Sequence, residues 1–176
     1  MSEEKIVQAN RENLQVATFA AGCFWGVEEA FRQVKGVKST IVGYTGGWFK
    51  NPKYRDVCSH KTGHAEAVEI QFNPDEVSYK DLLDVFWSIH DPTTKDKQGP
   101  DIGSQYRSMI AYHTSEQELL AKRSKEGLEA SGKFKGGIVT EIVPASTFHI
   151  AEEYHQKYYQ KTGSGGSCRS VYSIRR

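Results

Sequence analysis

The chain has 176 residues, of which 38% are hydrophobic, and its 23 Lys and Arg side chains balance 22 Asp and Glu. This length fits one domain with extended ends, and the balanced charge argues against nucleic acid or an anionic membrane as a partner. No segment has the apolar core of a signal peptide or a run of about 18 apolar residues, so we expect a soluble, cytoplasmic protein without membrane association.

Composition divides the chain into three parts. Residues 1–13 are charged and polar, and we expect a mobile N-terminus there. Residues 14–160 carry the periodic segments and are predicted to form a single domain. Residues 161–176 begin with a Gly/Ser-rich stretch, which is typical of flexible linkers, and form a tail that carries Cys168.

The first strand is predicted over residues 14–20 and leads through a tight turn at Gly22 into a helix. Glu28 and Glu29 fit the acid-rich first turn of this helix, and Gly36 fits its end. Four residues at i, i+3, i+4 and i+7 form its apolar stripe: Val27, Ala30, Phe31 and Val34.

Two further strands frame a long loop. Residues 37–44 predict the second strand, residues 48–61 a loop without periodicity, and residues 64–72 the third strand. Glu66 shares one face of the third strand with apolar side chains, among them Val68. A carboxyl group there is either a functional acid with a raised pKa or a group at the mouth of the strand.

A second helix begins after Ser78, with Asp81 as its capping partner, and ends at residues 90–92. The polar residues 93–103 predict a surface loop that carries Asp101. A fourth strand is predicted over residues 106–113.

The remaining elements follow in the last third of the chain. A capping box that starts at Ser115 predicts a peripheral helix to about residue 130, and residues 138–143 predict an edge strand. Four residues at helical spacing predict a final helix: Phe148, Ala151, His155 and Tyr158.

The element order through residue 113 is βαββαβ, the pattern of a ferredoxin-like fold. Right-handed crossovers would place both helices on one face of a mixed sheet. The sequence therefore predicts an α+β fold, built as a two-layer ferredoxin-like sandwich.

The three cysteines, Cys23, Cys58 and Cys168, are too few and too scattered for a disulfide-rich secreted fold. In a reducing compartment such thiols are either reactive or buried. Cys58 lies near His60 and His64, which are ligand residue types, but no Cys-x-x-Cys pair accompanies them. We therefore expect neither a metal nor a cofactor.

Cys23 is predicted to lie where the first strand turns into a helix. The unpaired backbone N–H groups and the macrodipole at a helix N-terminus favour an anion, which lowers the pKa of a thiol there. Phe24 and Trp25 follow as two large apolar side chains. Cys23 is then either a nucleophile or a buried structural thiol beside core aromatics.

The segment Gly22-Cys23-Phe24-Trp25-Gly26 resembles the active-site signature of the type A peptide methionine sulfoxide reductases. Further segments resemble that family in the same order, over nearly the whole chain from residue 20 to about residue 160. They are residues 43–47, 51–54, 57–58, 62–66, 90–93, 98–103, 105–108 and 151–156. The resemblance implies the same two-layer core with additional helices and a long C-terminal coil, and residues 14–160 would be the catalytic domain.

The resemblance also implies a reaction, the thiol-dependent reduction of methionine S-sulfoxide, in proteins or free, to methionine. Cys23 would attack the sulfoxide sulfur and Glu66 would protonate the oxygen. Tyr54, Asp101 and Tyr106 match the family positions that hold the oxygen. Phe24 and Trp25 match the apolar wall around the methyl group. The S epimer is expected because type A enzymes are restricted to it.

This reaction would leave a sulfenic acid on Cys23, which a second thiol must clear. The seven residues from Lys161 to Cys168 can span about 23–25 Å, and resolving cysteines in Gly-rich tails occur in the family. Cys168 is therefore our first choice, and Cys58 in the long loop is the second. The resulting disulfide would be reduced by a thioredoxin-type partner.

Two other functions stay open at this point. A non-catalytic domain of the same fold could bind a side chain in the aromatic pocket, but such a domain would need neither Cys23 nor Glu66. A Cys–His hydrolase is the second alternative, although nothing in the sequence selects a base among the candidates, which are His64, His90, His149 and His155. We expect the protein to be a monomer.

Overall fold

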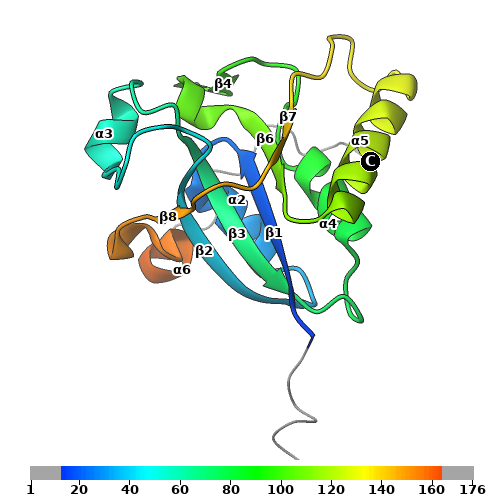
Figure 1. Cartoon of the computed structure of the whole chain (residues 1–176), viewed down its shortest axis with the longest axis horizontal. Helices are drawn as coiled ribbons and strands as arrows, with labels where there is room; N and C mark the ends of the chain where they lie inside the picture. The colour runs from blue at the N-terminus through cyan, green and yellow to red at the C-terminus, as the bar shows by residue number, and fades with distance from the viewer. Residues whose placement is uncertain (1–12, 164–176) are drawn as a thin grey trace, which may run out of the picture.

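The computed structural model describes residues 13–163 (Figure 1). The predicted mobile N-terminus therefore lies outside the described residues except for residue 13. Most of the predicted tail, with Cys168, also lies outside them.

A six-stranded mixed sheet, in the order β7-β6-β1-β3-β2-β8, forms the centre of the described residues (Figure 1). Neighbouring strands are antiparallel except β6 and β7, which are parallel. The strands are β1 (Gln15–Ala21), β2 (Val37–Thr45), β3 (Ala65–Phe72), β6 (Ser108–Tyr112), β7 (Glu141–Pro144) and β8 (His149–Ile150). The predicted α+β class with a mixed sheet is confirmed.

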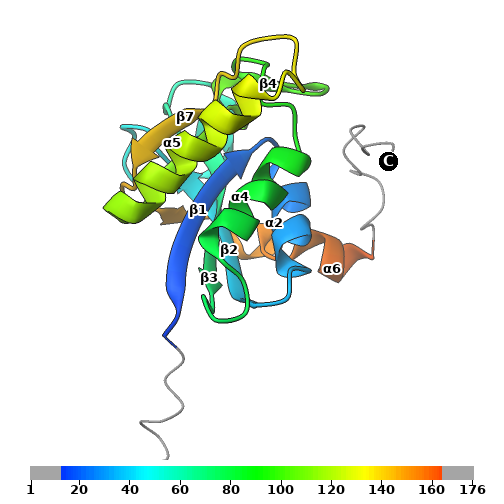
Figure 2. The same ribbon diagram turned by 90° about the vertical axis from the view of Figure 1, so that its right-hand side faces the viewer.

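Three helices pack on the sheet: α2 (Phe24–Arg32), α4 (Tyr79–Ser88) and α5 (Ser115–Ala130). Helix α2 contacts β2 and β3, α4 contacts β1, and the two helices contact each other. Figure 2 shows α2 and α4 side by side on one face of the sheet. Helix α5 lies against α4, β6 and β7. Among residues 13–163, no helix is long and apolar enough to cross a membrane.

The main core lies between this face and the helices. Phe19 of β1 stacks on Phe31 of α2 and on Phe86 of α4, with ring centroids 5.1 and 5.3 Å apart. The opposite face carries a smaller cluster of small residues around Met109. Burial of aromatic rings on one face therefore holds both helices on the strands that carry the site.

Several elements form where the periodicity predicted them. Helix α4 begins after Ser78, whose hydroxyl accepts a hydrogen bond from the Asp81 backbone N–H at 3.0 Å. Helix α5 begins as predicted, but its cap is different. The hydroxyl of Thr114, not of Ser115, accepts the hydrogen bond from the Gln117 backbone N–H at 3.1 Å.

The predicted positions of Glu28 and Glu29 in the first turn of α2 are wrong, because that turn holds no acidic residue. The helix begins at Phe24, so Glu28 lies one turn further along and is 1% exposed. Its carboxylate accepts hydrogen bonds from the Thr40 hydroxyl, at 2.9 Å, and from the Lys157 backbone N–H. The carboxylate ties the C-terminal segment to the core instead of offsetting the helix dipole.

The predicted final helix is also wrong. Residues 148–158 form β8, a 3₁₀ turn over Glu153–His155 and only the start of α6 (Tyr158–Thr162). The Gln156 side chain holds this segment, because it accepts from the backbone N–H of Val42 and donates to its carbonyl, both at 2.9 Å. Pairing with the edge of β2 therefore prevails over the local helical spacing.

Two of the predicted loops contain short regular elements. Within residues 48–61 the chain forms α3 (Tyr54–Cys58), and residues 93–103 contain the small hairpin β4 (Lys97–Gln98) and β5 (Asp101–Ile102). The fourth strand starts two residues later than predicted, so Tyr106 lies in a 3₁₀ turn and not in a strand.

Candidate active site

Cys23 lies at the junction of β1 and α2, as the sequence predicts. Strand β1 ends at Ala21, and Gly22 turns the chain with φ +97°, where a Cβ atom would come within 2.7 Å of Gln98. Cys23 is the N-cap residue of α2 and is half-buried. The thiol therefore meets the positive end of a nine-residue helix.

Glu66 lies on β3, opposite Tyr44 of β2, on the face that carries the main core. Its side chain is 3% exposed. Burial raises the pKa of Glu66 to about 8; the Phe24 backbone N–H lowers it in part, and the negative charge of Asp101 raises it. Oε2 of Glu66 is buried and makes no hydrogen bond with residues 13–163. The carboxyl is thus mostly protonated at neutral pH, with one oxygen open to a ligand.

Tyr106 lies close to both Cys23 and Glu66. Burial raises its pKa, and the charges of Glu66, Asp101, Cys58 and Cys23 raise it further, in that order. Burial likewise raises the pKa of the Asp101 carboxyl. The fold thus gathers four groups from β3, the 3₁₀ turn, the β4–β5 hairpin and the start of α2.

Tyr54 reaches the same place from α3. Burial raises its pKa, and a hydrogen bond to the Cys58 sulfur, one helical turn later, raises it too; Tyr106 and Glu66 add to the effect. All five residues proposed from the sequence as nucleophile, acid or oxygen-holding groups therefore lie together.

Aromatic rings close one side of this cluster. Phe24 is 1% exposed and lies 5.8 Å from Tyr44 and 5.1 Å from His155, between ring centroids. Trp25 stacks on Tyr158, with centroids 3.7 Å apart and planes at 8°. A thiol at a helix start, a buried carboxyl group and an aromatic wall thus meet in one place.

A family model described as peptide methionine sulfoxide reductase matches residues 15–176. The chain is 63% identical to the peptide methionine sulfoxide reductase MsrA of Methanosarcina mazei, over 92% of this chain and 78% of that protein. The chain belongs to the peptide methionine sulfoxide reductase family. It is an oxidoreductase, and its function is thiol-dependent reduction of methionine sulfoxide.

Solved structures of this family have the same fold. Mxr1 from Saccharomyces cerevisiae in reduced form superposes with a TM-score of 0.83 at 35% identity, over 92% of both chains. Mxr1 in complex with Trx2 superposes with a TM-score of 0.59 at 28% identity, over 85% of this chain and 87% of that chain. The sulfoxide reductase fold is therefore shared across these sequences.

Glu152 and His155 lie around the candidate site, although neither was predicted from the sequence to have a role in a reductase. Glu152 accepts hydrogen bonds from the Tyr44 hydroxyl at 3.4 Å, the Tyr54 backbone N–H at 3.3 Å and the Tyr154 hydroxyl at 3.3 Å. His155 lies among the aromatic rings. Both belong to the segment 151–156 that carried part of the resemblance, and that segment was the available signal.

Two of the histidines considered as a hydrolase base, His64 and His90, have other partners in this reductase. The His64 ring bonds the Gly47 backbone N–H at 3.0 Å and the Phe49 carbonyl at 2.7 Å. The His90 ring bonds the Phe86 carbonyl and the Ser108 hydroxyl, both at 2.7 Å. These contacts occupy both ring nitrogens of each histidine, which leaves neither ring to act as a base.

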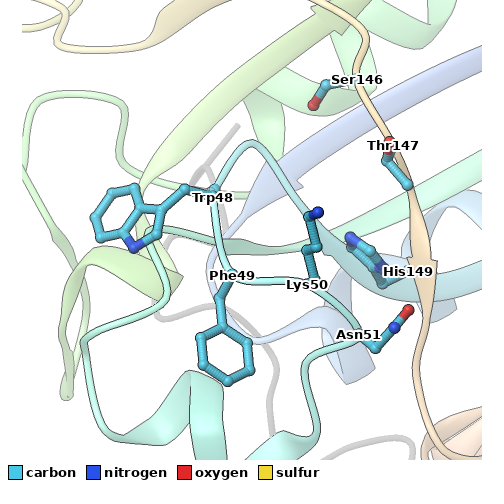
Figure 3. A pocket seen from close by; sticks show the side chains of 8 residues that line it. Trp48, Phe49, Lys50, Asn51, Ser146, Thr147 and His149 are labelled. Atoms are coloured by element: carbon cyan, nitrogen blue, oxygen red, sulfur yellow. The ribbon is translucent and has the colours of Figure 1, made fainter.

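Within the described part of the chain, no group of three or more His, Cys, Asp and Glu side chains could hold a metal ion. A pocket of about 370 Å³ lies between the loop after β2 and the chain at the start of β8, and Cys23 is not among the residues that line it (Figure 3). Trp48 and His149 are among the side chains that line it.

Proposed function

We propose that this reductase acts on methionine S-sulfoxide, in proteins or free, through a covalent step at Cys23. The Cys23 thiolate attacks the sulfoxide sulfur, and Glu66 gives its proton to the oxygen. The oxygen then passes to Cys23 as a sulfenic acid, and methionine leaves. Sulfur is reduced in the substrate and oxidised in the enzyme, so no other reactant enters this half of the cycle.

The observation that carries this proposal is the state of Glu66. A carboxyl group with a pKa near 8 keeps its proton at neutral pH. Its Oε2 has no partner among the described residues, although the side chain is almost fully buried. A buried acid with an open oxygen beside a helix-start thiol is suited to protonating a sulfoxide oxygen at the moment when the thiolate attacks.

The oxygen would be held by the hydroxyls of Tyr54 and Tyr106 and by Asp101, which can donate to it only while its carboxyl holds a proton; burial raises the pKa of Asp101 and so favours that form. The raised pKa values of both phenols keep their hydroxyl groups protonated, and Tyr54 would exchange its hydrogen bond to the Cys58 sulfur for one to the polarised oxygen. Donors fixed before the reaction stabilise charge where it develops. Phe24 and Trp25 would enclose the methyl group.

The second half of the cycle requires another thiol. We propose that Cys168 attacks the Cys23 sulfenic acid, which releases water and forms a disulfide. Cys168 lies outside the described residues, and Cys58 remains the alternative because its charge, like that of Cys23, acts on Tyr106. The yeast relative Mxr1 has been solved with Trx2, which supports a thioredoxin-type reductant here.

Turnover of separated S and R epimers of methionine sulfoxide tests the proposed function. With dithiothreitol and, in parallel, with thioredoxin, the S epimer should give methionine with loss of one dithiol per product. The R epimer should give none. Binding of the S epimer without consumption of thiol would instead identify a binding domain, and turnover of the R epimer would contradict the assigned specificity.

We also propose the finer architecture predicted from the sequence. The order β6-β1-β3-β2, with each neighbouring pair antiparallel, supports a ferredoxin-like sandwich. Residues 14–160 would be one catalytic domain, acting as a monomer in the cytoplasm.

A further inference from the structure

His155 holds the Trp25 indole in place. The Trp25 Nε1–H donates a hydrogen bond to His155 Nδ1 at 2.9 Å, across 130 residues of sequence. Because Nδ1 of His155 accepts this hydrogen bond, it carries no proton, and the proton of the neutral imidazole must lie on Nε2. The bond therefore fixes both the tautomer of His155 and the rotation of the indole about its own axis.

The surroundings of His155 leave its ring little freedom. It is 1% exposed, and the rings of Phe24, Tyr54 and Tyr154 lie 5.1, 4.7 and 4.0 Å away between centroids. Its Nε2 lies 3.8 Å from Glu152 Oε2 and makes no hydrogen bond with the described residues. The imidazole is thus packed as an aromatic group whose one directed bond goes to Trp25.

The backbone beside His155 is fixed as well. Gln156 bonds both backbone groups of Val42, and the Lys157 backbone N–H donates to the buried Glu28. Tyr158 then covers one face of the Trp25 indole. The C-terminal segment therefore supplies both the hydrogen-bond acceptor and the stacking partner of a residue only two positions after Cys23.

We propose that His155 is a positioning residue of this reductase: it orients the Trp25 indole as a wall of the methyl-binding pocket and so sets affinity for the sulfoxide. This inference rests on the proposed function, in which Trp25 lines that pocket. His155 touches no reacting atom in this scheme. Its removal should therefore weaken substrate binding more than it slows the chemistry.

Two substitutions of His155 distinguish the effect of its hydrogen-bond acceptor from the effect of its ring packing. His155→Phe keeps an aromatic ring but has no acceptor, whereas His155→Asn places an amide oxygen near the position of Nδ1 but loses the ring. We expect His155→Phe to raise KM for free methionine S-sulfoxide about three- to tenfold, the range for one lost hydrogen bond, with little change in kcat. We expect His155→Asn to lie closer to the wild type. His113→Phe is the matched control, because His113 bonds Thr18 in the middle of β1, on the face opposite the main core.

Trp25→Phe completes a double-mutant cycle. In that background the donor is already gone, so His155→Phe should add little to KM. Additive effects of the two substitutions would show that His155 acts independently of Trp25. A wild-type KM in His155→Phe with a raised KM in His155→Asn would show that only ring packing matters. Either result overturns the proposal.

Nuclear magnetic resonance of the wild-type protein tests the bond without any variant. The imidazole ¹⁵N signals of His155 should report the Nε2–H tautomer, and the indole N–H signal lost in Trp25→Phe should be that of a hydrogen-bonded donor. An Nδ1–H tautomer overturns the inference whatever the activity shows. Failure of the proposed function would appear differently, as absence of sulfoxide turnover in the wild type.

Discussion

Burial of Glu66 makes the stability of the folded protein depend on pH, because the buried site disfavours the ionised carboxylate. Its pKa is 4.5 in an ordinary setting and about 8 in the folded protein. Below pH 4.5 both the folded and the unfolded chain hold the proton, and above it the unfolded chain loses the proton first. The free energy of unfolding should therefore fall as pH rises through this window, by an amount on the order of a few kcal/mol.

Glu66→Gln should accordingly stabilise the protein at alkaline pH. The amide keeps the shape and the acceptor for the Phe24 N–H but cannot ionise, so the gain should be largest near pH 8 and small near pH 4.5. Thermal unfolding at both pH values measures it. Glu69→Gln, on the same strand but with a more exposed side chain, is the control. A variant that is less stable than the wild type near pH 8 would contradict a buried, protonated Glu66.

Asp101 should set the pH at which Glu66 loses its proton. The Asp101 charge raises the pKa of Glu66, so Asp101→Asn should lower that pKa. Since the reaction needs protonated Glu66, the alkaline fall in the single-turnover rate should move to lower pH in this variant. The position of the fall is the readout, because loss of an oxygen-holding group would reduce the rate at every pH. If the rate of Asp101→Asn falls at an unchanged or higher pH, the Asp101 charge does not raise the pKa of Glu66.

At the scale of elements, the cap of α5 offers a direct comparison of two neighbouring residues. Thr114→Ala removes the hydroxyl that accepts from Gln117 and should cost about 1 kcal/mol of stability, or roughly 2–4 °C in Tm. Ser115→Ala should change Tm little, although the sequence pattern placed the capping box there. Differential scanning calorimetry of the two variants decides between them, and turnover should be unchanged in both. A larger loss in Ser115→Ala would restore the cap predicted from sequence.

The sequence predicted correctly those elements whose conformation is determined by residues within the element itself. The alternation of side chains between two faces located β3, and the Ser78–Asp81 capping pair located the start of α4. The false final helix shows the limit of this approach. His155 and Tyr158 have helical spacing, but Gln156 bonds Val42 on β2, more than a hundred residues away in sequence, and no local pattern contains that pairing.

The candidate site likewise contains some residues that local sequence patterns indicate and others that they do not. The local pattern made Cys23 a candidate nucleophile and Glu66 a candidate acid, each beside a structural alternative, and the family resemblance selected the functional role. Tyr54 and Asp101 lie in α3 and β5, two short elements within segments that the sequence predicts as loops, so only the family resemblance selected them. His155 acts through a distant indole, and its sequence context alone does not distinguish it from the other histidines.

At the scale of the whole molecule, the proposed clearing of the sulfenic acid by Cys168 would link the core to the tail. Without reductant, one equivalent of methionine S-sulfoxide should leave a Cys23–Cys168 disulfide, identified by peptide mapping. Cys168→Ser should still form one methionine per enzyme and turn over with dithiothreitol, but it should lose most thioredoxin-supported turnover. A Cys23–Cys58 linkage in the wild type would transfer the resolving role to α3.

The most direct test of the mechanism is the rate of methionine release in a single turnover, measured against pH for the wild type and for Glu66→Gln. If Glu66 is the acid, the wild-type rate declines as pH rises past about 8, where its carboxyl loses the proton. Glu66→Gln should be slower by about 10²–10⁴-fold and should lack that decline. An equal rate and an equal pH profile in the two proteins would contradict the account, because the oxygen would then take its proton from another group.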